Sequence, residues 1–119
     1  MKILVIDDER AIRNSLKEIL MLEGYEVETA ENGVQGIAMV EKEKYDVIFC
    51  DIKMPEMDGD EVLDRLVAMG IDAAIVMISG HGDINSAVAC IKRGAFDFIP
   101  KPLDLNRILI TIRNATDKV

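Results

Sequence analysis

Four apolar runs of this sequence, each about as long as a buried strand, end directly in charged or hydroxyl residues. In a parallel sheet the carboxyl ends of all strands lie along one edge, so the residues that follow these runs would meet there. They are three carboxylates, one hydroxyl and one amine: Asp7, Asp8, Asp51, Ser79 and Lys101. Crowded carboxylates repel each other unless a cation lies among them, and hard divalent cations prefer oxygen ligands. The pattern therefore predicts a parallel sheet with a metal site at its carboxyl edge.

Strand-like and helix-like segments alternate five times, which indicates a doubly wound α/β domain. Asn32 with Gln35, and Asp58 with Glu61, have the spacing of a helix capping box. We expect strands at about 2–7, 25–30, 46–51, 73–79 and 95–99, and helices at about 9–22, 32–44, 58–70, 84–93 and from 104 nearly to the end.

The strand order follows from how the strands are patterned. Strands buried on both faces read as continuous apolar runs, whereas edge strands can alternate. The second expected strand alternates and the fifth places Asp97 between two phenylalanines, so both belong at edges. Right-handed crossovers then give a five-stranded parallel sheet of order 2-1-3-4-5 with helices on both faces. Its topological switch point, where ligands bind in such sheets, is where Asp7, Asp8 and Asp51 would lie.

Length and composition narrow the functional classes. The 119 residues predict one domain covering 1–119. A formal net charge of −8 argues against a nucleic-acid surface, since phosphate backbones require a basic patch. No apolar stretch approaches the roughly 20 residues that span a bilayer, and no signal peptide precedes the first strand. Cys50 and Cys90 lack metal or redox spacing and are expected to pack in the core. A cytoplasmic domain without membrane contact fits best.

The converging residues are the groups that phosphoryl transfer requires. An aspartate can act as a nucleophile toward a phosphoryl group and form an aspartyl-phosphate. The transferring group carries its charge on oxygen atoms, so catalysis consists mostly of positioning and electrostatic stabilisation. A carboxylate-bound Mg²⁺, a lysine and a hydroxyl can all stabilise that charge. The sequence therefore predicts a phosphoryl-transfer pocket.

Four motifs lie at the ends of the expected strands: Asp7-Asp8, the run Asp51-Ile-Lys-Met-Pro-Glu-Met-Asp-Gly59, Ser79-Gly80 and Lys101-Pro102. On these motifs the chain resembles, from end to end, a receiver domain of a two-component response regulator. A narrower similarity, to receivers of nitrogen-regulation-type transcription activators, lies in 79–83 and 94–102.

The resemblance implies the chemistry of the site. Asp51 would accept a phosphoryl group from a sensor histidine kinase. Asp7, Asp8 and Asp51 would hold Mg²⁺, or Mn²⁺, with the backbone carbonyl of Lys53 as a further ligand. Such a domain is a switch rather than an enzyme, because it catalyses only its own phosphotransfer and dephosphorylation. Lys53 and His81 occupy positions that tune the lifetime of the phosphoryl group.

The resemblance also implies how the signal leaves the pocket. Ser79 and Lys101 would contact the phosphoryl oxygens, and a cis peptide bond before Pro102 would aim the lysine. Phe98 would change rotamer on activation and alter the face made by the fourth helix, fifth strand and fifth helix. This face would control a phosphorylation-dependent homodimer, an effector domain or the transcription machinery. It exposes polar candidates of both signs: Asn85, Lys92, Asp97, Arg107 and Arg113.

Two other functions stay open at this point. A Mg²⁺-dependent phosphohydrolase could use an aspartyl nucleophile, but such enzymes carry it on the first strand in an Asp-x-Asp pattern, and here Asp51 follows the third. An unphosphorylated interaction module would be expected to have lost pocket residues, whereas all five are present. The chain also lacks the glycine-rich motifs that bind nucleotide phosphates.

Overall fold

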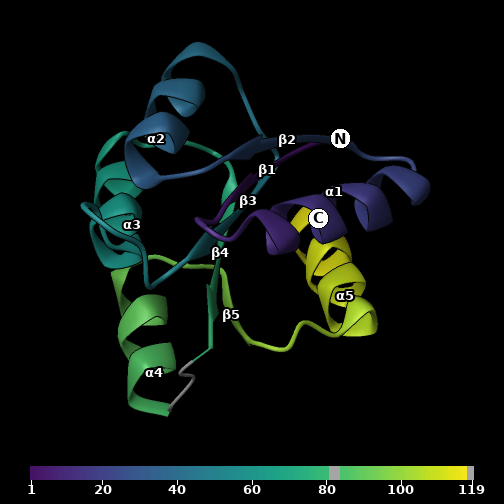
Figure 1. Cartoon of the computed structure of the whole chain (residues 1–119). Coiled ribbons are helices and arrows are strands. Elements are labelled where there is room, and N and C mark those ends of the chain that lie inside the picture. Colours follow the sequence, from purple (N-terminus) through teal and green to yellow (C-terminus); the bar gives the residue numbers. More distant parts are fainter. Residues whose placement is uncertain (81–83, 118–119) are drawn as a thin grey trace.

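The expected strands form one parallel sheet with helices on both faces (Figure 1). The computed structural model describes residues 1–80 and 84–117. The strands are β1 (Lys2–Ile6), β2 (Glu26–Ala30), β3 (Val47–Asp51), β4 (Ala74–Ser79) and β5 (Asp97–Pro100). The helices are α1 (Arg10–Leu22), α2 (Gly33–Lys42), α3 (Gly59–Ala68), α4 (Ile84–Arg93) and α5 (Leu105–Thr116). The sheet order is β2-β1-β3-β4-β5, which confirms the predicted topology.

The hydrophobic core has two halves, one on each face of the sheet. Successive side chains of a strand point to opposite faces, so Leu4 packs toward α2, α3 and α4, while its neighbour Val5 packs toward α1 and α5. Figure 1 shows the same division, with α1 and α5 on one side and the other three helices on the other. Cys50 and Cys90 are free and buried in the first half, as the sequence predicted. The central strands are continuous apolar runs because both of their faces are covered.

The two edge strands are less buried and carry the predicted polar residues. In β5 the carboxylate of Asp97 is half-buried and faces α5. It accepts hydrogen bonds from Thr111 Oγ1 at 3.0 Å and from Arg107 Nη2 at 2.9 Å. It also accepts one from the backbone N–H of Phe98 at 2.8 Å. The polar residue that marks the strand as an edge therefore ties it to a helix.

The predicted helix starts are partly right. Asn32 caps α2 by accepting a hydrogen bond from Gln35 N at 2.8 Å, but Gln35 Oε1 accepts from Glu31 N rather than from the cap residue. Asp104 caps α5. Asp58 stands at the N-cap of α3, yet its side chain makes no cap bond, so that part of the prediction was wrong. Within the described ranges, no helix combines the length and apolarity needed to cross a bilayer.

Candidate functional site

The carboxyl ends of the central strands carry the predicted residues to one place. The strand register pairs Ile6 with Cys50 and Asp51 with Ile78. The residues that follow β1, β3 and β4 therefore leave the sheet at the same level. Asp7, Asp51 and Ser79 are 0%, 3% and 3% exposed. Burial of charged and hydroxyl groups is costly unless they have partners, so these residues need each other or a ligand.

Lys101 is the cation that reaches these carboxylates. Its Nζ lies 3.2 Å from Asp7 Oδ2 and 3.5 Å from Asp51 Oδ1. Its backbone N–H donates to the carbonyl of Ser79 at 2.8 Å, which fixes the start of the segment that follows β5. The peptide bond between Lys101 and Pro102 is cis, as expected. Residues from three strand ends are thus in contact around one ammonium group.

Asp7 is held firmly on one side and open on the other. Its Oδ1 accepts a hydrogen bond from Glu9 N at 2.8 Å, and its carbonyl accepts one from Arg13 Nη1 at 2.7 Å. Its Oδ2 is buried and has no hydrogen-bond partner within the described residues, although the ammonium of Lys101 lies at ion-pair distance. A buried, oriented carboxylate oxygen without a hydrogen bond is suited to a metal ion.

The acidic cluster fits a divalent cation. The carboxylates of Asp7, Asp8, Glu9 and Asp51 each place an oxygen within 4.8 Å of the others. Asp8 and Glu9 are exposed, so water could complete the shell of a Mg²⁺ ion, which usually keeps several waters. Glu9 was not predicted as part of this cluster, because the prediction covered only the residues that directly follow each strand. The run of three acidic residues at 7–9 was the signal that could have identified it.

The electrostatics of the site reflect this crowding. Burial, followed by the charge of Asp7, raises the pKa of Asp51 to about 6. Burial also raises the pKa of Asp7. Burial lowers the pKa of Lys101, but contact with Glu9 and the charges of Asp7 and Asp51 outweigh it, so the pKa is raised overall. The carboxylates are therefore destabilised as anions until more positive charge arrives.

A pH dependence follows for the metal-free protein. The pKa of Asp51 is about 6 in the fold, above its ordinary 3.8, so between these values the folded state binds more protons than the unfolded state. This group's contribution to stability therefore rises as the pH falls from about 7 to about 4. Asp51→Asn should be more stable than the wild type at pH 7 by about 1–3 kcal/mol, and the difference should vanish near pH 4. Urea unfolding without metal measures it, and a difference that stays constant with pH contradicts this origin.

Other predicted residues lie around this centre. Lys53 is exposed on the loop after β3. Phe98 is 9% exposed and packs in the core half beneath α4, while Phe96, 45% exposed, is the aromatic that faces solvent in this region. His81 falls outside the described residues. The roles assigned to Lys53, His81 and Phe98 stay predictions.

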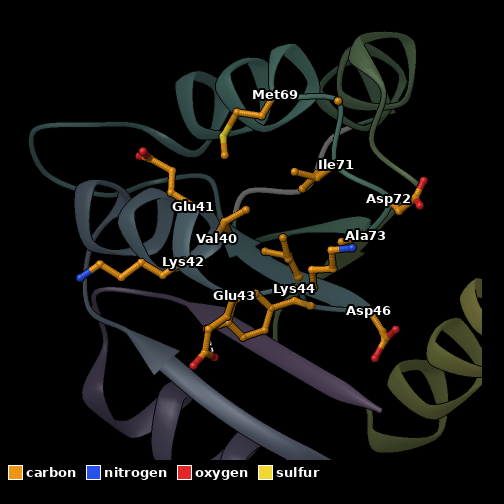
Figure 2. Close-up of a pocket in the computed structure, with 13 residues that line it drawn as sticks. Val40, Glu41, Lys42, Glu43, Lys44, Asp46, Met69, Ile71, Asp72 and Ala73 are labelled. Carbon is orange, nitrogen blue, oxygen red and sulfur yellow. Dashed lines mark hydrogen bonds between the residues drawn. The ribbon is translucent and has the colours of Figure 1, made fainter.

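A hollow in the surface lies away from the acidic cluster. It has a volume of about 630 Å³ and is bordered by the connections from α2 to β3 and from α3 to β4. Figure 2 shows its lining, which includes Val40, Lys44 and Ile71. Both connections lead into the amino ends of strands, whereas the acidic cluster is at the carboxyl ends. None of the predicted site residues lines it.

Comparison with known proteins places these features in context. A family model described as the response regulator receiver domain matches residues 3–113. The response regulator MprA of Mycobacterium leprae (strain TN) is 39% identical over 113 residues, which are 95% of this chain and 50% of MprA. The chain therefore spans about half the length of the curated relatives it matches.

Solved structures agree with the sequence match. NtrX from Brucella abortus superposes with a TM-score of 0.89 at 38% identity, covering 96% of this chain and 26% of that chain. The beryllofluoride-activated NtrC4 receiver domain dimer gives a TM-score of 0.90 at 37% identity, covering 96% of this chain and 94% of that chain. The similarity therefore extends over nearly the whole fold described above.

Proposed function

Because this chain belongs to the family of response regulator receiver domains, whose general function is a phosphorylation-activated switch, we propose that Asp51 is its phosphoryl acceptor. The donor would be a sensor histidine kinase in the cytoplasm, and residues 1–119 would form the receiver domain. The observation that carries the proposal is the contact of one ammonium, that of Lys101, with the buried carboxylates of Asp7 and Asp51. An acceptor in such a place has a positive charge beside it before the phosphoryl group arrives.

The proposed reaction is an in-line displacement at phosphorus. One carboxylate oxygen of Asp51 forms a bond to phosphorus as the bond from phosphorus to the donor's nitrogen breaks, and the donor imidazole leaves with the electron pair. Lys101 would donate hydrogen bonds to one phosphoryl oxygen and Ser79 to another. The backbone of both residues is fixed by the strand ends, so only a local movement of each would be needed to reach the phosphoryl oxygens.

The residues present also fit a metal ion. Asp7, Asp8 and Asp51 would hold Mg²⁺, or Mn²⁺, together with the carbonyl of Lys53. The ion supplies positive charge to the phosphoryl oxygens when bound. Asp7 is the residue best prepared for it, since its buried Oδ2 has no hydrogen-bond partner within the part of the chain described. In the same proposal, water that reaches Asp51 past exposed Asp8 would hydrolyse the aspartyl-phosphate and release inorganic phosphate. The domain would then catalyse only its own phosphorylation and dephosphorylation.

The acceptor function is tested with a small phosphoryl donor. Incubation of the chain with acetyl phosphate and Mg²⁺ should add one phosphoryl group, visible as one mass increment in intact-protein mass spectrometry. The increment should be absent when a chelator removes the metal, because the acidic cluster then repels the anionic donor. Labelling that proceeds equally well in chelator would overturn the metal-dependent mechanism.

Metal binding should be visible without phosphorylation. A ligand that binds only the folded state stabilises it by mass action, by about 1.4 kcal/mol at ten times its dissociation constant. Millimolar Mg²⁺ should therefore raise the melting temperature by a few degrees, and Asp7→Asn should reduce this response. A melting temperature that Mg²⁺ leaves unchanged in the wild type would count against the site.

The output is proposed to run through α4, β5 and α5. Phosphorylation would draw Ser79 toward the new oxygens, and Phe98, already packed beneath α4, would adjust with it. The face would then pair with a second copy of the chain or with an effector domain. The matched relatives are about twice as long as the matched region, so an effector domain would fit in their remaining half. Static light scattering with and without beryllofluoride tests the homodimer; a monomer in both states leaves effector docking as the output.

A further inference from the structure

The carboxylate nearest to the ammonium of Lys101 is not the proposed acceptor. Glu9 Oε1 lies 3.1 Å from Lys101 Nζ, compared with 3.2 Å for Asp7 and 3.5 Å for Asp51. The contact between Glu9 and Lys101 also has hydrogen-bond geometry. The lysine side chain is 14% exposed and that of Glu9 is 59% exposed, so Glu9 approaches the ammonium from the solvent side of the acidic cluster.

The side chain of Glu9 makes no other hydrogen bond or ion pair within the described residues. Glu9 is the N-cap residue of α1, but its side chain makes no cap hydrogen bond. Its backbone N–H, not its carboxylate, holds Asp7. Within residues 1–80 and 84–117, the only hydrogen bond or ion pair of this carboxylate is the one with Lys101. Its position is therefore not explained by a capping hydrogen bond.

Glu9 and a phosphoryl group compete for the same ammonium. A phosphoryl group on Asp51 adds negative charge to a site that already contains four carboxylates. The ammonium has three donors and is shared among Glu9, Asp7 and Asp51, so a donor engaged by Glu9 is not available to the phosphoryl group. Because Glu9 is largely exposed, its carboxylate can move into water when the ammonium turns inward.

We propose that Glu9 is a positioning residue that holds Lys101 toward the solvent side of the acidic cluster in the resting state and releases it when Asp51 is phosphorylated. The proposal rests on the proposed function, since it needs the phosphoryl group on Asp51. Glu9 thereby stabilises the unphosphorylated state and slows phosphorylation by anionic donors.

The test is the rate of labelling by acetyl phosphate in Glu9→Gln. Glutamine keeps the size of the side chain but removes its charge, so it holds the ammonium less strongly and the ammonium can turn inward more easily. The rate should rise by about two- to fivefold, as expected for a largely solvated ion pair. The gain should shrink at high salt, since screening already weakens the pair in the wild type. Glu18→Gln, an exposed change on the same helix, is the matched control and should label at the wild-type rate.

Mg²⁺ affinity, followed by thermal shift without any donor, separates a positioning role from a metal-ligand role. If Glu9 were a metal ligand, Glu9→Gln would lose both Mg²⁺ affinity and labelling, which would overturn the proposal. An unchanged labelling rate would overturn it as well. A labelling gain with Mg²⁺ affinity kept within about twofold supports it.

A double-mutant cycle tests the contact independently of phosphorylation. Glu9→Gln and Lys101→Met, alone and combined, are compared by urea unfolding without metal. A non-additive shift in the unfolding midpoint supports the contact, and strict additivity contradicts it. If the wild type fails to label at all, the proposed function fails, while this cycle still reports on the pair.

Discussion

Asp51→Asn is expected to abolish phosphorylation while preserving the fold. The amide cannot act as the nucleophile, so labelling by acetyl phosphate should fall by at least about a thousandfold. The replacement is nearly isosteric, and Asp51 sits at the end of a fully buried strand, so packing is retained. Because the charge of Asp7 contributes to the raised pKa of Asp51, the neutral amide should relieve repulsion rather than create it.

The matched control removes a carboxylate elsewhere. Asp72 is exposed and borders the hollow away from the acidic cluster, and Asp72→Asn should label like the wild type. Circular dichroism and urea unfolding confirm that both variants are folded. Persistent full labelling of a folded Asp51→Asn would falsify the assignment of the acceptor.

Gly59→Ala should damage both stability and phosphorylation. A Cβ at this position would lie 2.2 Å from the carbonyl oxygen of Asp51 and 2.7 Å from Ile52 Cα. Both are backbone atoms, so no side chain can turn aside to make room. Gly59 N also donates to the carbonyl of Ile52 at 2.8 Å, which holds the start of α3 against the end of β3. The methyl group must therefore push the backbone that carries the proposed acceptor.

The expected cost is about 3 kcal/mol in unfolding free energy. Labelling should fall by about 100-fold, because a displacement of the nucleophile of about an ångström has that effect. Gly70→Ala is the comparison: Gly70 has a φ of +67° but nothing within 4 Å of its added Cβ. It should cost about 1–2 kcal/mol, the strain of a positive φ alone, and label normally. Equal losses in both variants would show that the close approach at Gly59 is unimportant.

The parts of the fold set by hydrophobic pattern could be predicted from the sequence. The central strands are continuous apolar runs and the edge strands are interrupted by polar residues, and these patterns together with right-handed crossovers give the sheet order. The ends of the elements were harder to predict. Asp58 has the sequence of a cap without making the cap bond, because helix ends depend on a few local hydrogen bonds rather than on a repeating pattern.

The same contrast holds at the site. Topology predicts that residues directly after parallel strands converge, and Asp7, Asp51 and Lys101 are in contact as expected. Glu9 was not predicted, because its contact with Lys101 depends on how one exposed side chain turns at the start of α1. The steric role of Gly59 was also hidden, since the sequence does not show which backbone lies against a glycine.

The central claim is that the phosphoryl group is carried by Asp51, and chemical trapping tests it most directly. Borohydride reduces an acyl phosphate but not a phosphate ester, and converts an aspartyl-phosphate to homoserine. After labelling with acetyl phosphate and Mg²⁺, reduction and peptide mass spectrometry should place homoserine at position 51 and nowhere else. Homoserine at position 7 or 8, or a phosphoryl group that resists reduction because it lies on a hydroxyl such as that of Ser79, would contradict the account.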